Sequence, residues 1–311
     1  MKRLIACLLV CILLCGCSAD APVTKQTYSM DTLMSLTIWG SQSIDYFNSL
    51  SDLINLLESQ WSVTKEDSII SRLNRGEEVT LDAEQQAFLD KIGELTKRTG
   101  GTFDPKLYNV SAAWGFYSKE GRVPTEAEIA TALSQPLWDL GAAVKGYAGQ
   151  QCVELLQDLG CPRALLDLGG NIQIYGTKAD GTPWRIGIQD PDNDAATLGI
   201  LSVEGTMSIV TSGDYQRYFT QDGKDYHHIM DPETGRPADS GLRSVTVICR
   251  DGLTADALST ALFVMGLEEA SEFWRNSDDF EAVFLTKDGK LYATEGAQLS
   301  DCEFEVIKRE N

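Results

Sequence analysis

Histidine is nearly absent from this sequence, which contains two in 311 residues. Basic residues are also scarce: 26 Lys and Arg stand against 46 Asp and Glu, and the net charge at pH 7 is −20. Two histidines cannot build a histidine-rich metal site, so any metal must be held mainly by oxygen atoms, which favours Mg²⁺, Ca²⁺ or Mn²⁺. The lack of a basic stripe argues against nucleic acid as a partner.

Common cofactor motifs and long hydrophobic runs are missing as well. The sequence has no GxxxxGK[ST], no GxGxxG and no HExxH, which excludes P-loop, Rossmann and zincin sites at the level of motif. The apolar run from Leu4 to Leu14 has 11 residues, whereas a membrane-spanning helix needs about 20. Because Lys2 and Arg3 precede this run, residues 1–16 are expected to be a secretory signal peptide.

The end of the apolar run carries the sequence Leu14-Cys15-Gly16-Cys17. It resembles a bacterial lipobox, which implies cleavage before Cys17 and lipid on its thiol and new N-terminus. The alternative is an ordinary signal peptide with incidental cysteines. Residues 17–26 would then be the lipidated Cys and a tether. The expected location is the outer face of a bacterial cell membrane, or its periplasmic side, with the lipid as the only anchor.

Four further cysteines follow: Cys152, Cys161, Cys249 and Cys302. An exported protein can pair such residues. Buried, unpaired thiols are an equally good interpretation, because Cys152 precedes an apolar helical pattern and Cys249 lies in an apolar strand-like run. The sequence leaves their disulfide state open.

The pattern of apolar residues predicts a single large α+β domain over residues 27–311. No Pro/Ser-rich linker or charge block divides it, and strands and helices alternate without a regular βαβ count. Helices are expected over 44–61, 82–99, 147–159, 254–265 and 268–275. Strands are expected over 27–39, 164–175, 184–188, 199–203, 208–211, 242–249 and 282–286.

Several polar residues stand beside small ones where a ligand could approach. Lys145 lies between small residues at the mouth of a predicted helix, where an anion can bind, although a lone Lys is more often a surface residue. Asp256 and Thr260 lie one turn apart on a helix and could hold a hard cation. The alternative is that Asp256 merely caps that helix. His227 and His228 lie just before an Asp-Pro-Glu-Thr-Gly turn and can titrate near neutral pH.

Short motifs follow one another along the sequence in this order: Met30-Asp31-Thr32, Phe103-Asp104-Pro105, Asp139-Leu140-Gly141-x-x-x-Lys145-Gly146, Leu168-Gly169-Gly170, Ser212-Gly213-Asp214-Tyr215, His228-Ile229-x-Asp231-Pro232-x-Thr234-Gly235 and Ala255-Asp256-x-x-x-Thr260. Their order resembles the ApbE family of FAD:protein FMN transferases, and the resemblance runs from Thr27 to the C-terminus. The sequence departs from the family at Gly141-Ala142-Ala143-Val144, where Gly-Gly-Ile-Ala is usual. It also departs at Lys106 and Gln150, where the family commonly has Thr and Asp.

The resemblance implies an enzyme that moves FMN from FAD to a Ser or Thr hydroxyl of a partner protein and releases AMP. The partner would be a membrane-associated redox protein. Mg²⁺ would bind to Asp256, the Thr260 hydroxyl and the main-chain carbonyl of Ala142. His228 would be the general base, with Asp256 the second catalytic residue. The expected FAD contacts are Met30, Trp61, Thr102, Phe103, Asp104, Asp139, Lys145, Ser212, Gly213, Asp214 and Ile229.

Two other functions stay open at this point. If water replaces the acceptor hydroxyl, the same site is an FAD pyrophosphatase that yields FMN and AMP. A lipoprotein that only binds flavin is the other alternative, and it would have no need of Asp256 and Thr260 beside a phosphate site.

Overall fold

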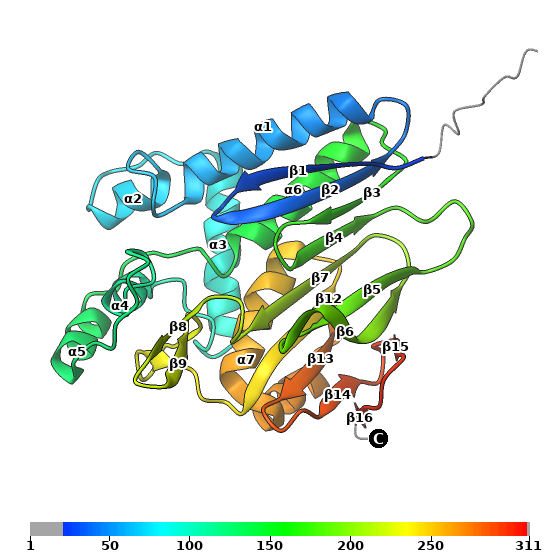
Figure 1. The fold of residues 1–311 in the computed structure, drawn as a ribbon. Helices are drawn as coiled ribbons and strands as arrows, with labels where there is room; N and C mark the ends of the chain where they lie inside the picture. Colours follow the sequence, from blue (N-terminus) through cyan, green and yellow to red (C-terminus); the bar gives the residue numbers. More distant parts are fainter. Residues whose placement is uncertain (1–20, 310–311) are drawn as a thin grey trace, which may run out of the picture.

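The computed structural model describes residues 21–309, and a large, mostly antiparallel β-sheet runs through it (Figure 1). Within that range the sheet has nine strands, and only β14 and β16 pair in parallel. In spatial order the strands are β1 (Val23–Ser29), β2 (Thr32–Trp39), β3 (Arg163–Asp167), β4 (Asn171–Tyr175), β7 (Met207–Gly213), β12 (Leu242–Cys249), β13 (Phe280–Thr286), β14 (Leu291–Thr294) and β16 (Glu305–Ile307).

Each face of the sheet is covered by a different layer. Phe284 packs with α7 on one face, whereas its neighbours Val283 and Leu285 pack on the other face with a small sheet, as strand alternation requires. The helical layer consists of α1 (Ser43–Trp61), α3 (Ala83–Arg98), α6 (Val144–Asp158) and α7 (Gly252–Arg275). The small sheet consists of β15 (Leu299–Ser300), β6 (Asn193–Val203) and β5 (Trp184–Asp190). This arrangement agrees with the predicted α+β domain.

Local sequence explains where the main helices begin. Asp82 caps α3 by accepting from the Gln85 backbone N–H at 2.8 Å, and Gln85 returns a side-chain bond to the Asp82 N–H. Asp251 caps α7 by accepting from the Thr254 N–H at 2.6 Å. Asp256 is therefore not the cap of α7 but lies inside it. Gly266, with φ of 78°, breaks α7 in the region between the two predicted helical stretches.

Two strands predicted as continuous are hairpins instead. The expected strand 27–39 is β1 and β2 joined at Met30 and Asp31, both of which have positive φ, 50° and 58°. The expected strand 164–175 is β3 and β4 joined at Gly169 and Gly170, with φ of 75° and 86°. Both runs looked continuous because apolar residues flank very short turns. The turns matter because they bring Met30 and the paired glycines to one end of the sheet.

A smaller lobe at this end of the sheet was not predicted at all (Figure 1). Its members carry weak or mixed patterns in six residues or fewer, apart from α5. They are α4 (Tyr108–Ala113), α5 (Glu126–Ser134), β8 (Tyr218–Gln221), β9 (Lys224–His227), β10 (Met230–Asp231) and β11 (Arg236–Pro237). Trp114, Ile129 and Met230 form its buried core. The short helix α2 (Ile69–Asn74) follows α1 and was also missed.

Helices α6 and α7 cross at unusually close range. A Cβ atom placed on Gly146 would lie 2.6 Å from Cβ of Asp256 and still closer to the carbonyl oxygen of Gly252. A Cβ on Gly252 would lie 2.5 Å from the carbonyl oxygen of Gly146. Only glycine permits two backbones to approach this closely. The crossing therefore fixes the first turn of α6 against the first turns of α7.

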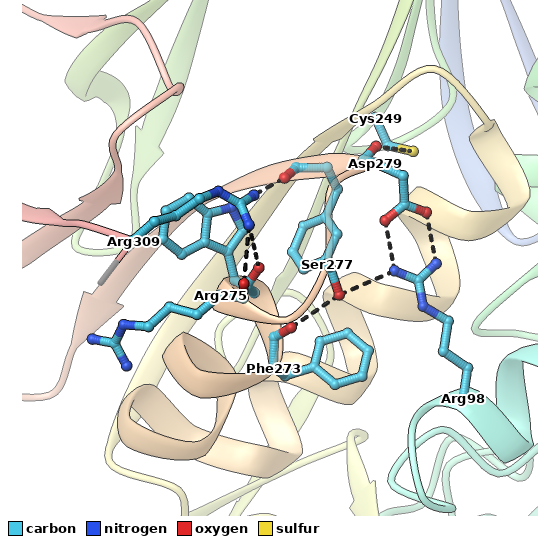
Figure 2. A network of polar contacts seen from close by, with 9 residues as sticks. Arg98, Cys249, Phe273, Arg275, Ser277, Asp279 and Arg309 are labelled. Carbon is cyan, nitrogen blue, oxygen red and sulfur yellow. Dashed lines mark hydrogen bonds and ion pairs between the residues drawn. The ribbon is translucent and has the colours of Figure 1, made fainter. Parts of the chain in front are cut away.

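A polar network ties the end of α3 to the turn after α7 (Figure 2). Arg98 donates from both terminal nitrogens to the two carboxylate oxygens of Asp279, each at 2.6 Å. Ser277 accepts a further bond from Arg98 at 3.3 Å. Beside this network, Arg309 donates to the carbonyl oxygen of Arg275 at 3.0 Å. The network therefore joins the end of α3 to the turn between α7 and β13.

The remaining sequence predictions concern thiols and membranes. Cys152, Cys161, Cys249 and Cys302 are all free, so the interpretation as unpaired thiols is correct, and burial raises the pKa of Cys152 to about 12. Among residues 21–309, no helix is long and apolar enough to cross a bilayer. Cys17 and the expected signal peptide lie outside the described residues.

Candidate active site

A cavity of about 540 Å³ opens where the lobe meets the end of the large sheet. Most of the residues expected at the site line it, although they come from segments far apart in the sequence. These lining residues are Met30, Thr102, Phe103, Asp104, Asp139, Ala142, Lys145, Ser212, His228, Ile229, Asp256 and Thr260. The juxtaposition places a carboxylate, hydroxyls, a lysine and a histidine around one space large enough for a nucleotide.

Asp256 is the most buried acid of the cavity wall. Its Oδ2 accepts from the Gly146 backbone N–H at 2.8 Å, across the crossing of α6 and α7. Burial raises the pKa of the Asp256 carboxyl group, and the Lys145 charge, the Gly146 N–H and the Asn171 side chain act in the opposite direction. A cation bound beside this buried carboxyl group would stabilise its charged form.

The Thr260 hydroxyl faces the same cavity from the next turn of α7. Its Oγ1 lies 3.2 Å from Oγ of Ser212, which also contacts Oγ of Ser259 at 2.8 Å. Ala142, just before α6, completes the expected set of cation ligands through its carbonyl group and also lines the cavity. No group of three His, Cys, Asp or Glu side chains gathers anywhere in residues 21–309. A cation here would rely on one carboxylate plus neutral oxygens, as Mg²⁺ tolerates.

Positive charge reaches the cavity from two residues. Lys145 is the second residue of α6, so its ammonium group and the N-terminus of a helix act on the same space. Arg217, between β7 and β8, lines the cavity as well and was not predicted. Their charges, with the helix terminus, make this region attractive to an anion although the whole chain is acidic.

His228 and His227 lie in different surroundings. The ring Nδ1 of His228 is 3.2 Å from the carbonyl oxygen of Arg217. Since a carbonyl only accepts, Nδ1 donates and Nε2 keeps its lone pair. Burial, with the nearby Arg217 and Lys145 charges, lowers the pKa of His228 to about 3, so the ring is neutral at neutral pH. His227 instead bonds the Ala238 carbonyl oxygen at 3.0 Å, packs against Phe263 and does not line the cavity.

Three expected FAD contacts are not brought to the cavity. Trp61 is 1% exposed and packs edge-on against Phe88 in the core between α1 and α3, with ring centroids 4.7 Å apart. Gly213 ends β7 without lining the cavity. Asp214 turns towards Arg243, at 3.6 Å. Sequence order placed these residues near the site, but strand alternation and core packing direct them elsewhere.

The turns that carry Asp104 and Asp139 are stabilised by those side chains themselves. Oδ1 of Asp104 accepts from the Lys106 N–H at 2.9 Å and so closes the turn at Pro105. Oδ1 of Asp139 accepts from the Gly141 N–H at 3.0 Å, and its Oδ2 accepts a short bond from the Tyr117 hydroxyl. Burial and the Asp139 charge raise the pKa of Tyr117 well above its usual value. Tyr117 stays a protonated donor and fixes Asp139 at the cavity wall.

Asp31 joins the three segments around the mouth of the cavity. It accepts from the Tyr28 hydroxyl at 2.9 Å and from Lys119 at 2.9 Å, and it lies 4.0 Å from Arg217. The Lys119 bond lowers the pKa of the Asp31 carboxyl group. Lys119 lies in the loop between α4 and α5, so this cluster connects the β1–β2 turn to the lobe. Local sequence gave no signal for this cluster, because Lys119 lies 88 residues beyond Asp31 and Arg217 lies further still.

Comparisons with known proteins identify one family that this chain matches. The model of the ApbE family matches residues 30–284. A protein of Klebsiella pneumoniae named FAD:protein FMN transferase is 39% identical over 232 residues, covering 71% of each chain. A protein of the same name from Treponema pallidum is 29% identical over 335 residues, covering 93% of this chain and 92% of its own.

Solved structures show the same fold. The ApbE protein of Thermotoga maritima superposes with a TM-score of 0.82 at 28% identity, covering 89% of this chain and 98% of its own. The flavin transferase ApbE of Vibrio cholerae gives 0.78 at 27% identity over the same shares. Because the family model spans most of the sequence and all of the cavity, the chain belongs to the ApbE family.

Proposed function

We propose that this protein transfers FMN from FAD to a Ser or Thr hydroxyl of an acceptor protein and releases AMP. Relatives that share its length carry the name FAD:protein FMN transferase. The observation that carries the proposal is the meeting of Asp256 and Thr260 with Lys145 in one cavity. A protein that only stores flavin would not need a buried carboxylate beside a phosphate-binding cation.

The residues present fit a Mg²⁺ ion. Asp256 is 4% exposed, lines the cavity and shares a helix face with the Thr260 hydroxyl. The Ala142 carbonyl would be the third protein ligand. When bound, Mg²⁺ would supply positive charge that offsets the charge of the FAD pyrophosphate and of the leaving phosphate.

The chain's own residues would position the reactants. Lys145 and the N-terminal end of α6 would hold the pyrophosphate by their positive charge. The acceptor hydroxyl oxygen attacks the phosphorus on the FMN side of the pyrophosphate. A new P–O ester bond forms, the P–O bond to AMP breaks, and the hydroxyl proton passes to Nε2 of His228. The neutral ring with Nδ1 fixed by the Arg217 carbonyl is in the state that this step requires.

The test is transfer itself. The protein is incubated with FAD, Mg²⁺ and a Thr-containing peptide from a candidate acceptor, and the mass of the peptide is then measured by mass spectrometry. We expect one FMN added per AMP released, and loss of transfer by orders of magnitude in a folded Asp256→Ala variant. Free FMN and AMP without a heavier peptide would instead show an FAD pyrophosphatase. A folded Asp256→Ala protein with normal Mg²⁺ dependence would refute the cation site.

We further propose that the mature protein is held on the outer face of a bacterial membrane by lipid on Cys17, close to a membrane-associated redox protein as acceptor. The support is the lipobox-like sequence Leu14-Cys15-Gly16-Cys17. In cells, Cys17→Ala should leave the protein unprocessed or released from the membrane fraction. Unchanged processing and membrane attachment of that variant would exclude the lipid anchor.

A further inference from the structure

Two large apolar side chains are exposed at the tip of the β1–β2 hairpin. Tyr28 is 66% exposed and Leu33 is 56% exposed, the two highest values among large hydrophobic residues in the part of the chain that the structure describes. They pair directly across β1 and β2, so their side chains lie side by side on one face of the sheet. A single exposed Leu is ordinary on a protein surface, but these two residues form one continuous apolar pair.

The buried neighbours of this pair show which way it faces. The Ser29 hydroxyl bonds a side chain of α1, and Met34 packs in the core with other side chains of α1. Since side chains alternate along a strand, Tyr28 and Leu33 point away from the helical layer. The small sheet covers this face at the other end of β2, where it packs on Trp39. The hairpin tip stays open to solvent.

The exposed pair adjoins the mouth of the cavity. The turn between the two strands, residues 30–32, lines that cavity, so Leu33 directly follows the lining and Tyr28 stands two residues before it. The Tyr28 hydroxyl donates to Asp31, which also accepts from Lys119 of the lobe, each at 2.9 Å. The hairpin tip is thus fixed against the lobe. A contact site that is already in place costs less to order when a partner binds.

The chemistry of the proposed function determines what reaches this rim. FAD is a small molecule that the cavity can hold, whereas the acceptor is a protein, and only one of its hydroxyl groups enters the cavity. The acceptor residues on either side of that hydroxyl must therefore pass over the rim. An extended chain rises about 3.3 Å per residue, so acceptor residues within roughly five positions of the hydroxyl reach the apolar pair.

We propose that Tyr28 and Leu33 form a docking site for the acceptor protein, and that they bind an apolar side chain of the segment that carries the modified Ser or Thr. This inference rests on the proposed function, because it takes a protein as the acceptor of FMN. Aromatic and apolar side chains at the centre of a contact supply much of its binding free energy. Lys119 and Arg217 would form the polar border of the contact. Such a site selects among segments that carry a hydroxyl, which the phosphate site alone does not.

The first measurement is the KM for an acceptor peptide. The probe is a Thr-containing peptide from a membrane-associated redox protein that takes up FMN in the transfer assay. Leu33→Ser and Tyr28→Ser should each raise this KM about 5- to 30-fold, because an apolar contact is lost, and should leave the Kd for FAD unchanged. Tyr28→Phe keeps the ring and should keep a KM near that of the parent. The matched control is Ile44→Ser, at the end of α1 far from the lobe (Figure 1), where the side chain is 53% exposed and the KM should not change.

The second measurement tests for direct contact. Replacing the apolar residues near the Thr of the peptide by Gln should raise the KM of the parent but add little in Leu33→Ser, because the two changes remove the same contact. Equal effects in the two enzymes would overturn the proposal. A weaker affinity of Leu33→Ser for FAD would show instead that the hairpin acts on the cavity. A parent dimer that dissociates in Leu33→Ser, seen by sedimentation, would make the pair a contact between copies of this chain and would refute the docking site.

Failure of this inference and failure of the proposed function give different results. Suppose that the parent modifies the peptide, and that both Ser variants, shown to be folded by thermal unfolding, do so with the parental KM. The docking site is then wrong and the transferase function stands. If no peptide gains FMN although FAD is bound and cleaved to FMN and AMP, the transferase function fails, and the docking site fails with it.

Discussion

The crossing of α6 and α7 predicts opposite outcomes for one substitution made at two helical glycines. In Gly146→Ala the new methyl group would lie 2.6 Å from Cβ of Asp256, whereas carbon atoms pack at about 3.5–4.0 Å. The helices must separate by about 1 Å. Overpacking of this kind costs about 1–3 kcal/mol, against a gain of about 0.4–1 kcal/mol from the stiffer unfolded chain. The expected net result is a loss of about 1–2 kcal/mol in the free energy of unfolding.

Gly93 in α3 provides the control, because no atom lies within 4 Å of a Cβ built there. Gly93→Ala should therefore raise the free energy of unfolding by about 0.5–1 kcal/mol. Urea titrations followed by far-ultraviolet circular dichroism measure both changes. A Gly146→Ala protein as stable as its parent, or more stable, would refute the close crossing.

Gly146→Ala should also affect the active site, because Gly146 is hydrogen-bonded to Asp256. Separation of the helices by about 1 Å would stretch the 2.8 Å bond from the Gly146 N–H to Asp256 beyond hydrogen-bonding range. Transfer activity of folded Gly146→Ala should therefore fall well beyond what its loss of stability explains, while Gly93→Ala retains parental activity. Equal activities of the two variants, each measured where it is fully folded, would show that Asp256 does not depend on the crossing.

Three further outcomes follow from the site and its surroundings. His228→Ala should lower kcat by about 10²–10⁴-fold with little change in the Kd for FAD, and His227→Ala should lower kcat far less; similar losses of FAD affinity in both would indicate a structural role. Trp61→Ala should lower the free energy of unfolding by about 3–5 kcal/mol, while Trp61→Phe should keep FAD affinity, because the ring packs on Phe88 and not on the cavity. Burial lowers the pKa of His227 to about 4, so between pH 6.5 and 4 the unfolded chain binds a proton that the folded chain does not. As the pH falls through this range, the free energy of unfolding should decrease by up to about 1.4 kcal/mol per pH unit. The urea midpoint of His227→Gln should decrease less steeply with falling pH than that of the parent.

Local patterns were sufficient for those parts of the fold that depend on neighbouring residues. The apolar spacing from Ile44 predicted α1, and the helix predicted over 82–99 is α3 with Asp82 as its cap. Asp256 and Thr260 could be paired because helical geometry places i and i+4 on one side. By contrast, the β1–β2 and β3–β4 hairpins turn within two or three residues, which an apolar run does not reveal.

The rest of the site depends on contacts that no local pattern encodes. Arg217 and Tyr117 reach the cavity only because the lobe folds against the end of the sheet. Asn171 follows the paired glycines and lines the cavity, where its side chain acts on Asp256, a residue far along the chain. Trp61 shows the converse: its place in the motif order suggested a ligand contact, whereas packing against Phe88 buries it.

The cavity takes one wall from the turn at Met30 and another from α7 near Thr260. A chain synthesised from its N-terminus therefore carries no assembled site until nearly all of it has left the ribosome, because the central strand β7 and helix α7 come late. Non-local pairing of this kind also slows folding. Nascent or truncated chains should bind no flavin, which confines the reaction to the finished molecule and keeps partly made protein from withdrawing FAD in the compartment where it is synthesised.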